Sequence, residues 1–311
     1  MPTFSAFTAP GRWFRGNCHT HTNLSDGKST PQETAELYRG LGYDFLVLTD
    51  HWKCHAEVES LCRKGFVVIP GIELHPPAGA PNTVISHHIV GIGVSKAPSK
   101  PRMQKQTARA ALRWIEREGG IAVYAHPYWS GHTIEHMREG RGAFGVEAFN
   151  NVCAVERGLG DSSAHVDMAL SAGFPWRIFA VDDLHSAQRD LSGGWIMVKS
   201  RELSQAAILR AIRRGHFYAT QGPVIRSVRI ERHTARIECS PVKAIVWHME
   251  GPYGRAFFAK EEPLTSSELN IRTRRGRTKY LRVEIIDADG KKAWSNPVWF
   301  DKERRCWTED L

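Results

Sequence analysis

The chain has 311 residues, of which 41% are hydrophobic and 24% charged, a balance typical of a folded globular protein rather than a disordered one. No stretch approaches the roughly 20 consecutive apolar residues that span a bilayer, and the first ten residues lack the basic and apolar regions of a signal peptide. We therefore expect a cytoplasmic protein with no membrane partner. The six cysteines include no Cys-x-x-Cys pair, which indicates reduced thiols rather than disulfides or a zinc knuckle.

The net charge of +9 is concentrated in the C-terminal third. Residues 201–311 hold 22 Lys+Arg against 14 Asp+Glu, or +8, which leaves 20 against 19, or +1, for residues 1–200. A basic surface attracts anionic substrates or nucleic acid. This one carries no motif in which aromatic residues interleave with the charges, so a solvated basic face is the simpler interpretation. Binding or processing of nucleic acid is an alternative that rests on the charge alone.

The first motif lies in Asn17–Gly27, where one residue separates His19 from His21 and Asp26 follows five positions later. Residues 13–18 predict a strand that leads into the motif, and strand alternation would point both histidines to one side. Imidazole is the commonest transition-metal ligand among side chains. The spacing also fits two packed or surface histidines, so the motif alone does not establish a metal site.

The segment after this motif carries the signals of a helix start. Thr30 is a candidate N-cap, Pro31 suits the first helical position, and Glu33 completes a capping box. Leu37 and Leu41 are expected to face inward. Further helices are expected at about 103–118, 161–172 and 204–214.

Short apolar runs alternate with these helices and predict strands. The runs are Tyr43–His51, Phe66–Ile72, Val84–Val94, Ile121–Ala125, Gly145–Phe149, Arg177–Val181 and Gly194–Val198. Such alternation predicts a parallel sheet or barrel of the α/β class. In these folds, ligands and catalytic groups gather at the carboxyl ends of the strands.

Histidines and carboxylates recur at the ends of these apolar runs. The residues at or just past a carboxyl end are His19, His21, His51, Glu73, His126, Asp183 and His185. A histidine that only packs in the core has no reason to prefer strand ends, so we interpret the set as one shared polynuclear metal site.

The character of the sequence changes after Gly215–Pro223, which predicts a turn and a domain boundary. The following segments are short and alternating, and they are Val228–Glu238, Val242–Met249, Tyr280–Ile286 and Ala293–Phe300. We expect a barrel over residues 1–222 and a small antiparallel, sandwich-like β domain over residues 223–311.

The ordered motifs resemble those of the PHP superfamily, the polymerase and histidinol phosphatase domain, across roughly residues 13–220. They are His19-Thr20-His21, Ser25-Asp26-Gly27, Thr49-Asp50-His51, Gly71-Ile72-Glu73, His88-Ile89-Val90-Gly91, Ala125-His126-Pro127, Val146-Glu147 and Asp183-Leu184-His185. The resemblance implies a distorted (β/α)7 barrel that holds two or three divalent ions at its carboxyl face.

The resemblance also implies a ligand set. One ion would be held by His19, His21, Glu73 and Asp183, a second by Glu73, His88 and His126, and a third by Asp26, His51 and His185. His88 is preferred to His87 because it stands in the His-Ile-Val-Gly context. Some relatives have histidine where Asp26 stands. Mixed imidazole and carboxylate donors suit Mn²⁺, Fe²⁺ or Zn²⁺.

Other roles near the site are assigned more loosely. If the third ion is absent, Asp26 and His185 are candidate proton donors to the leaving group. Lys28 is a candidate phosphate contact, although an exposed turn lysine is the simpler interpretation. Glu147 is open between support of the ligands and packing. The histidines without a matching motif are interpreted as structural or surface residues, and they are His55, His75, His132, His136, His165 and His216.

The leading functional hypothesis is a metal-dependent phosphoesterase that hydrolyses a small anionic organic phosphate by attack of a metal-bridging hydroxide. Only 37 residues separate His88 from His126, which leaves no room for the cap domain of the nucleotide-phosphatase-like branch. The segments Gly194-Trp195 and Phe217–Pro223 look like the branch with a C-terminal β domain, which includes carbaryl-hydrolase-like enzymes. Hydrolysis of carbamates or carboxylic esters is therefore the alternative. The oligomeric state is not predicted.

Overall fold

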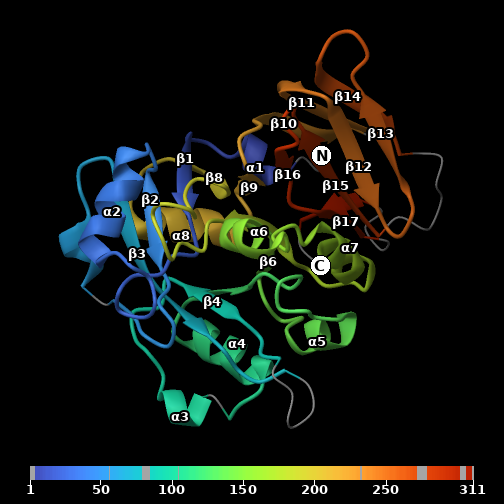
Figure 1. Ribbon diagram of the computed structural model, residues 1–311. Coiled ribbons are helices and arrows are strands. Elements are labelled where there is room, and N and C mark those ends of the chain that lie inside the picture. The colour runs from blue at the N-terminus through green and yellow to red at the C-terminus, as the bar shows by residue number, and fades with distance from the viewer. Residues whose placement is uncertain are drawn as a thin grey trace.

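The computed structural model describes residues 4–55, 57–78, 85–103, 105–231, 233–271, 279–301 and 306–309. Figure 1 shows a mixed α/β part in blue to yellow and a group of C-terminal strands in orange and red beside it. The first residue of the run expected over Val84–Val94 lies outside the described residues.

The α/β part is built on strands that neighbour one another in chain order. They are β1 (Arg12–Asn17), β2 (Phe45–Leu48), β3 (Val67–Leu74), β4 (Ile89–Ile92), β5 (Ile121–Tyr124), β6 (Gly145–Asn150) and β7 (Arg177–Val181). Strands β1, β2 and β3 are parallel, as are β5, β6 and β7, whereas β4 is antiparallel to both of its neighbours. The apolar residues of β2, β4 and β5 are buried throughout, which explains their uninterrupted hydrophobic runs.

The sheet closes on itself at the carboxyl ends of β1 and β7. A parallel bridge joins Thr20 to Leu184, the Asp183 amide donates to the His19 carbonyl over 3.0 Å, and the His21 amide donates to the Leu184 carbonyl over 2.9 Å. The expected α/β class and parallel-strand core are confirmed. The count of seven strand–helix units stays a prediction, because β4 runs against its neighbours.

Helices cover the outside of this sheet. Their bounds are α1 (Ser5–Thr8), α2 (Pro31–Gly40), 3₁₀ helix η1 (Val58–Leu61), α3 (Lys100–Met103), α4 (Ala108–Arg117), α5 (Ile134–Glu139), α6 (Asn151–Arg157), α7 (Ser163–Ser171) and α8 (Gln205–Arg213). The capping box of α2 is present, since the Glu33 amide donates to Thr30 Oγ1 and the Thr30 amide donates to Glu33 Oε2. Within the described ranges, no helix is long and apolar enough to cross a membrane.

Two expectations about these helices are wrong. Leu37 is partly buried and packs against the core as expected, but Leu41 is 41% exposed, and the fully buried positions of α2 are Thr34, Ala35 and Tyr38. The helix expected from about residue 103 begins at Ala108, where the Thr107 hydroxyl accepts from the Ala110 amide and caps it.

The sheet continues from the α/β part into the C-terminal strands. Strand β8 (Trp195–Ser200) pairs antiparallel with β1, β9 (Phe217–Thr220) pairs with β8, and β16 (Lys292–Trp294) pairs with β9. The turn expected over Gly215–Pro223 is therefore wrong in part, since the middle of that segment, Phe217–Thr220, is strand β9. The domain boundary between residues 222 and 223 stays a prediction.

The C-terminal strands are antiparallel, as expected. The remaining ones are β10 (Ile225–Glu231), β11 (Thr234–Val242), β12 (Ala244–Met249), β13 (Gly254–Phe258), β14 (Leu264–Asn270), β15 (Tyr280–Ile286), β17 (Val298–Asp301) and β18 (Cys306–Thr308). Strands β10, β11 and β14 form a small sheet of their own. The single segment expected over Val228–Glu238 is a hairpin of β10 and β11. Buried Trp247 links the sheets, because its Nε1 donates to Ser267 Oγ over 2.9 Å.

An ion pair between a buried arginine and a half-buried aspartate joins the two parts of the chain. Arg282 on β15 is fully buried, and its Nη2 lies 2.6 Å from Oδ1 of Asp167 on α7, while its Nη1 lies 3.3 Å from Glu284 Oε2. Burial alone would raise the pKa of Asp167, but a hydrogen bond with His248 and the charge of Arg282 lower it to about 2. The C-terminal strands are thus held against α7 by a desolvated cation.

We predict that Arg282→Met lowers the free energy of unfolding by about 3 to 5 kcal/mol, because it leaves Asp167 and Glu284 without their buried cation. Urea unfolding followed by circular dichroism measures the change. Arg236→Met is the matched control, since Arg236 is 43% exposed and pairs with Glu268 at the surface, where about 1 kcal/mol or less is expected. Equal effects of the two substitutions would contradict the prediction.

Candidate metal centre

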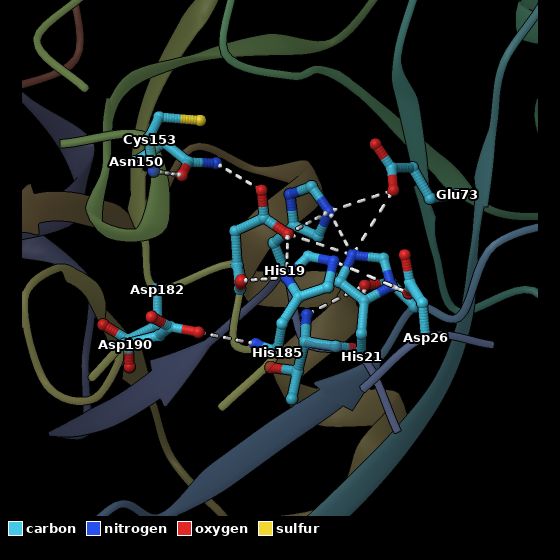
Figure 2. A network of polar contacts seen from close by, with 12 residues as sticks. His19, His21, Asp26, Glu73, Asn150, Cys153, Asp182, His185 and Asp190 are labelled. Carbon is cyan, nitrogen blue, oxygen red and sulfur yellow. Dashed lines mark hydrogen bonds and ion pairs between the residues drawn. The ribbon is translucent and has the colours of Figure 1, made fainter. Parts of the chain in front are cut away.

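Polar side chains from several strand ends meet in one buried cluster. His19 and His21 follow β1, Glu73 lies near the end of β3, and Asp183 follows β7. Figure 2 shows His19, His21 and Glu73 pointing toward one another, with Asp26 and His185 beside them. His88 precedes β4, yet it lies in the same cluster, because the amino end of a reversed strand is level with the carboxyl ends of its neighbours.

The Glu73 carboxylate lies at the middle of this cluster. Its Oε2 is 3.3 Å from His19 Nε2, 3.4 Å from His21 Nε2 and 2.7 Å from His51 Nδ1, and its Oε1 is 2.8 Å from His88 Nδ1 and 3.6 Å from His126 Nε2. Asp183 provides a second buried carboxylate, with Oδ1 at 3.2 Å from His19 Nε2 and 3.0 Å from His21 Nε2. The structure thus brings together all of the residues that the sequence analysis named as metal ligands.

The donor atoms in this cluster are suited to cations. Four buried atoms there lie close to one another or to other donor atoms, yet none meets a partner among the described residues in hydrogen-bond geometry: His51 Nδ1, Glu73 Oε2, His75 Nε2 and Asp183 Oδ1. Buried polar atoms are normally satisfied, and leaving one unpaired costs about 1 to 3 kcal/mol. Several sets of three or four donor atoms lie within 4.8 Å of one another, which is close enough to share an ion. The residues therefore fit divalent metals that accept mixed nitrogen and oxygen ligands.

A layer of hydrogen bonds holds the ligands from behind. Glu147 is buried on β6, its Oε1 lies 2.7 Å from His19 Nδ1, and its Oε2 accepts from the His126 amide over 3.0 Å. Asn150 Nδ2 donates to Glu147 Oε2 over 2.9 Å and to Asp183 Oδ2 over 3.0 Å. These contacts favour support of the ligands over packing as the role of Glu147. Asn150 was missed, although it stands at the end of the same strand.

Burial and neighbouring charges shift the pKa values of the histidines in this cluster in opposite directions. Burial lowers the pKa of His88 to about 3 and that of His21 to about 4, so both rings are neutral and present a lone pair. Burial alone would raise the pKa of Glu73, but the surrounding histidines hold it well below its ordinary range. The pKa of His185 rises to about 9, because Asp26 and neighbouring groups outweigh the effect of burial.

The backbone at two site residues adopts a conformation that is rare outside glycine. His126 has a φ of 24° and Asp183 a φ of 56°. Such a conformation persists only where the surroundings impose it. Around Asp183 they do so through the buried carboxylate of Asp182, which accepts the Tyr38 hydroxyl over 2.9 Å and the Gly193 amide over 2.8 Å.

The mouth of the centre is formed by the more exposed site residues. The side chain of Asp26 is 53% exposed, and its carboxylate lies 3.3 Å from His51 Nε2 and 3.5 Å from His185 Nε2. His185 Nδ1 donates to the Asp183 carbonyl over 2.8 Å. The Lys28 amide donates to the His185 carbonyl over 2.9 Å, which places this exposed lysine next to the mouth, and its contact with phosphate stays a prediction.

Two histidines that were not named as ligands, His87 and His75, differ in where they point. His87 points away from the centre, toward the Tyr124 hydroxyl at 2.8 Å and Glu139 at 3.1 Å, while His88 points into it. His75 was expected to be structural or superficial, and the structure places it in the cluster, with its Nε2 3.4 Å from Glu73 Oε2. The signal was present in the sequence, because residues 73 and 75 project from the same face of an extended strand.

We predict that Glu147→Gln weakens the affinity for Mn²⁺ or Zn²⁺ by about 10- to 100-fold, because the amide cannot hold both His19 and the His126 backbone as the carboxylate does. Competition with a chelating dye measures the affinity. The matched control is Glu139→Gln, since Glu139 contacts only His87, outside the centre. Equal affinities for the two variants would show that Glu147 has no supporting role.

A search of solved structures finds a two-domain protein from Bacteroides vulgatus, described as containing a predicted PHP-like metal-dependent phosphoesterase. It is 19% identical to this chain with a TM-score of 0.53, and the match covers 93% of this chain and 97% of that one. An amidohydrolase from Chromobacterium violaceum, solved with bound sulfate and no metal, is 15% identical over 56% of this chain and 89% of its own, with a TM-score of 0.41. No protein-family model and no curated protein matches the chain. The chain thus shares the fold of a two-domain protein with a PHP-like part, as the resemblance to the PHP superfamily predicted.

Proposed function

We propose that the protein is a metal-dependent hydrolase of the PHP type that cleaves a small organic phosphate. The observation that carries the proposal is the convergence of imidazole and carboxylate donors, some of them buried without a hydrogen-bond partner, at the end of the sheet. The shared fold with a protein described as containing a PHP-like phosphoesterase supports it.

Two sets of residues would hold the first two ions. His19, His21, Glu73 and Asp183 supply one set, and Glu73 joins His88 and His126 in the other. When bound, divalent ions supply a nucleophile from water near neutral pH and neutralise charge that develops on a phosphoryl oxygen. We infer Mn²⁺, Fe²⁺ or Zn²⁺ from the mixed donors.

The chain's own groups position the reaction and move the proton. Glu147 and Asn150 fix the ligands, so little reorganisation is needed when substrate binds. His185 is anchored through Nδ1 on the Asp183 carbonyl, which leaves Nε2 facing Asp26 and solvent. From that position His185 Nε2 would deliver a proton to the leaving-group oxygen, and Asp26 would hold the imidazolium.

The substrate is inferred from charge at the mouth. Lys28 and Lys53 are exposed there, and Lys53 Nζ donates to the Leu24 carbonyl in the loop that carries Asp26. Two cationic side chains beside a cation-binding centre favour a dianionic ligand over a neutral ester. A phosphate monoester has that charge, whereas a carbamate or carboxylic ester does not.

We predict that the Mn²⁺-loaded protein hydrolyses phosphate monoesters in a substrate panel and that Glu73→Gln abolishes this activity, since Glu73 contacts donors of both sets. Release of inorganic phosphate is the readout, and circular dichroism checks that the variant is folded. Glu139→Gln serves as the control and should retain activity. Turnover of aryl carbamates or carboxylic esters, with no phosphate released from any monoester, would replace the proposal by the ester-hydrolase alternative.

We further predict that His185→Gln slows hydrolysis of alkyl phosphates far more than that of p-nitrophenyl phosphate. A nitrophenolate leaves without a proton, whereas an alkoxide requires one, so loss of the proton donor costs about 10²- to 10⁴-fold only with the poor leaving group. Comparing kcat for the two substrates measures the effect. An equal loss on both substrates would show that His185 acts in another way.

A further inference from the structure

Three donor atoms meet at a position that the PHP ligand set does not include. His51 Nδ1 lies 2.7 Å and His75 Nε2 lies 3.4 Å from the same oxygen, Glu73 Oε2. The three residues offer donor atoms that all lie within 4.8 Å of one another. We propose that the third cation binds here, to His51, Glu73 and His75, and not to the outer set of Asp26, His51 and His185.

The hydrogen bonding separates the two positions. The three atoms of the inner set, His51 Nδ1, Glu73 Oε2 and His75 Nε2, are buried. Although His51 Nδ1 lies 2.7 Å from Glu73 Oε2, none of the three meets a partner among the described residues in hydrogen-bond geometry. A histidine that only packs in a core normally satisfies its ring nitrogens. The outer set differs, because its carboxylate belongs to Asp26, whose side chain is 53% exposed and already lies within 3.5 Å of two imidazoles, those of His51 and His185. A cation at the inner position would give these atoms a partner and so remove the free-energy cost of leaving them unpaired.

The ring of His75 is held so that its nitrogen faces this position. It stacks on His88, with ring centroids 4.0 Å apart and an interplanar angle of 21°, and it meets the His51 ring edge-on at 4.3 Å. Trp52 closes the outer side at 5.9 Å. These contacts restrict rotation of the ring, so the donor is oriented before a cation arrives.

The two positions exclude each other at His51. A neutral imidazole has one lone pair and one N–H, so it serves one ion at a time. If Nδ1 binds the cation, the proton lies on Nε2, and the 3.3 Å contact between Nε2 and Asp26 Oδ2 is then a hydrogen bond from ligand to carboxylate. This is the usual arrangement behind a metal-bound histidine.

The inner position also explains how Asp26 and His185 take part in chemistry. With the cation on the inner side of His51, these two residues carry no metal and remain an acid pair at the mouth. The inference rests on the proposed metal centre, but it concerns which atoms hold the cation and not which substrate is cleaved.

The test is the number of ions bound by two single variants. After reconstitution with Zn²⁺ and removal of excess metal, elemental analysis should show that His75→Ala binds one equivalent fewer than the wild type, while Asp26→Ala binds the wild-type number. His136→Ala is the matched control, because His136 contacts Thr133 outside the centre, and it should also bind the wild-type number. Wild-type stoichiometry in His75→Ala overturns the proposal, whatever Asp26→Ala does.

A measurement on the unaltered protein decides the case if His75→Ala fails to fold. Anomalous scattering at the zinc edge from crystals of the Zn²⁺-loaded wild type should place an ion within bonding distance of His75 Nε2. An ion bonded to the Asp26 carboxylate, with none at His75, overturns the proposal. Neither readout uses turnover, so an absence of phosphoesterase activity would count against the proposed function alone.

Discussion

Two carboxylates buried among imidazoles, Glu73 and Asp183, are the constraint on which the structure depends. A buried carboxylate is strongly destabilising unless opposite charge or hydrogen bonds surround it. Here the surrounding histidines come from different strand ends, so the sheet must bring the ends of β1, β3, β5 and β7 together around them. The buried apolar residues of the strands hold these ends in place. Hydrogen bonds from Glu147 and Asn150 then fix the side chains of His19 and Asp183. The apolar core of the sheet and the polar centre at its end therefore depend on each other.

The C-terminal strands also contribute to the surroundings of the centre, because they pack against helix α7. The shared sheet and the Arg282–Asp167 pair hold them against α7. Just before α7, the Ser162 hydroxyl accepts from the Tyr128 amide over 3.2 Å, in the loop that carries His126. A short chain of contacts therefore leads from the second part of the protein to a residue of the candidate centre.

Much of the centre was predictable from the sequence because its residues follow strand ends, and periodicity locates strand ends well. His19 and Asp183 are examples, since each lies just past the end of a strand that the sequence predicted, β1 and β7. The contact between His75 and Glu73 was not predicted, because His75 belongs to none of the motifs. Strand alternation alone would have placed the two residues on the same face. The reversal of β4 was not predictable, because strand direction depends on pairing and not on local residues. The hairpin over Val228–Glu238 was missed for the same reason, as its two arms read as one alternating run.

The joint between β1 and β7 has a consequence for how the molecule assembles. The pairing of Thr20 with Leu184 connects positions that are far apart in the chain, so forming it costs more loop entropy than a local contact does. His19, His21 and Asp183 flank that joint. A cation that binds these residues would therefore cross-link the two ends of the α/β segment and offset part of that cost.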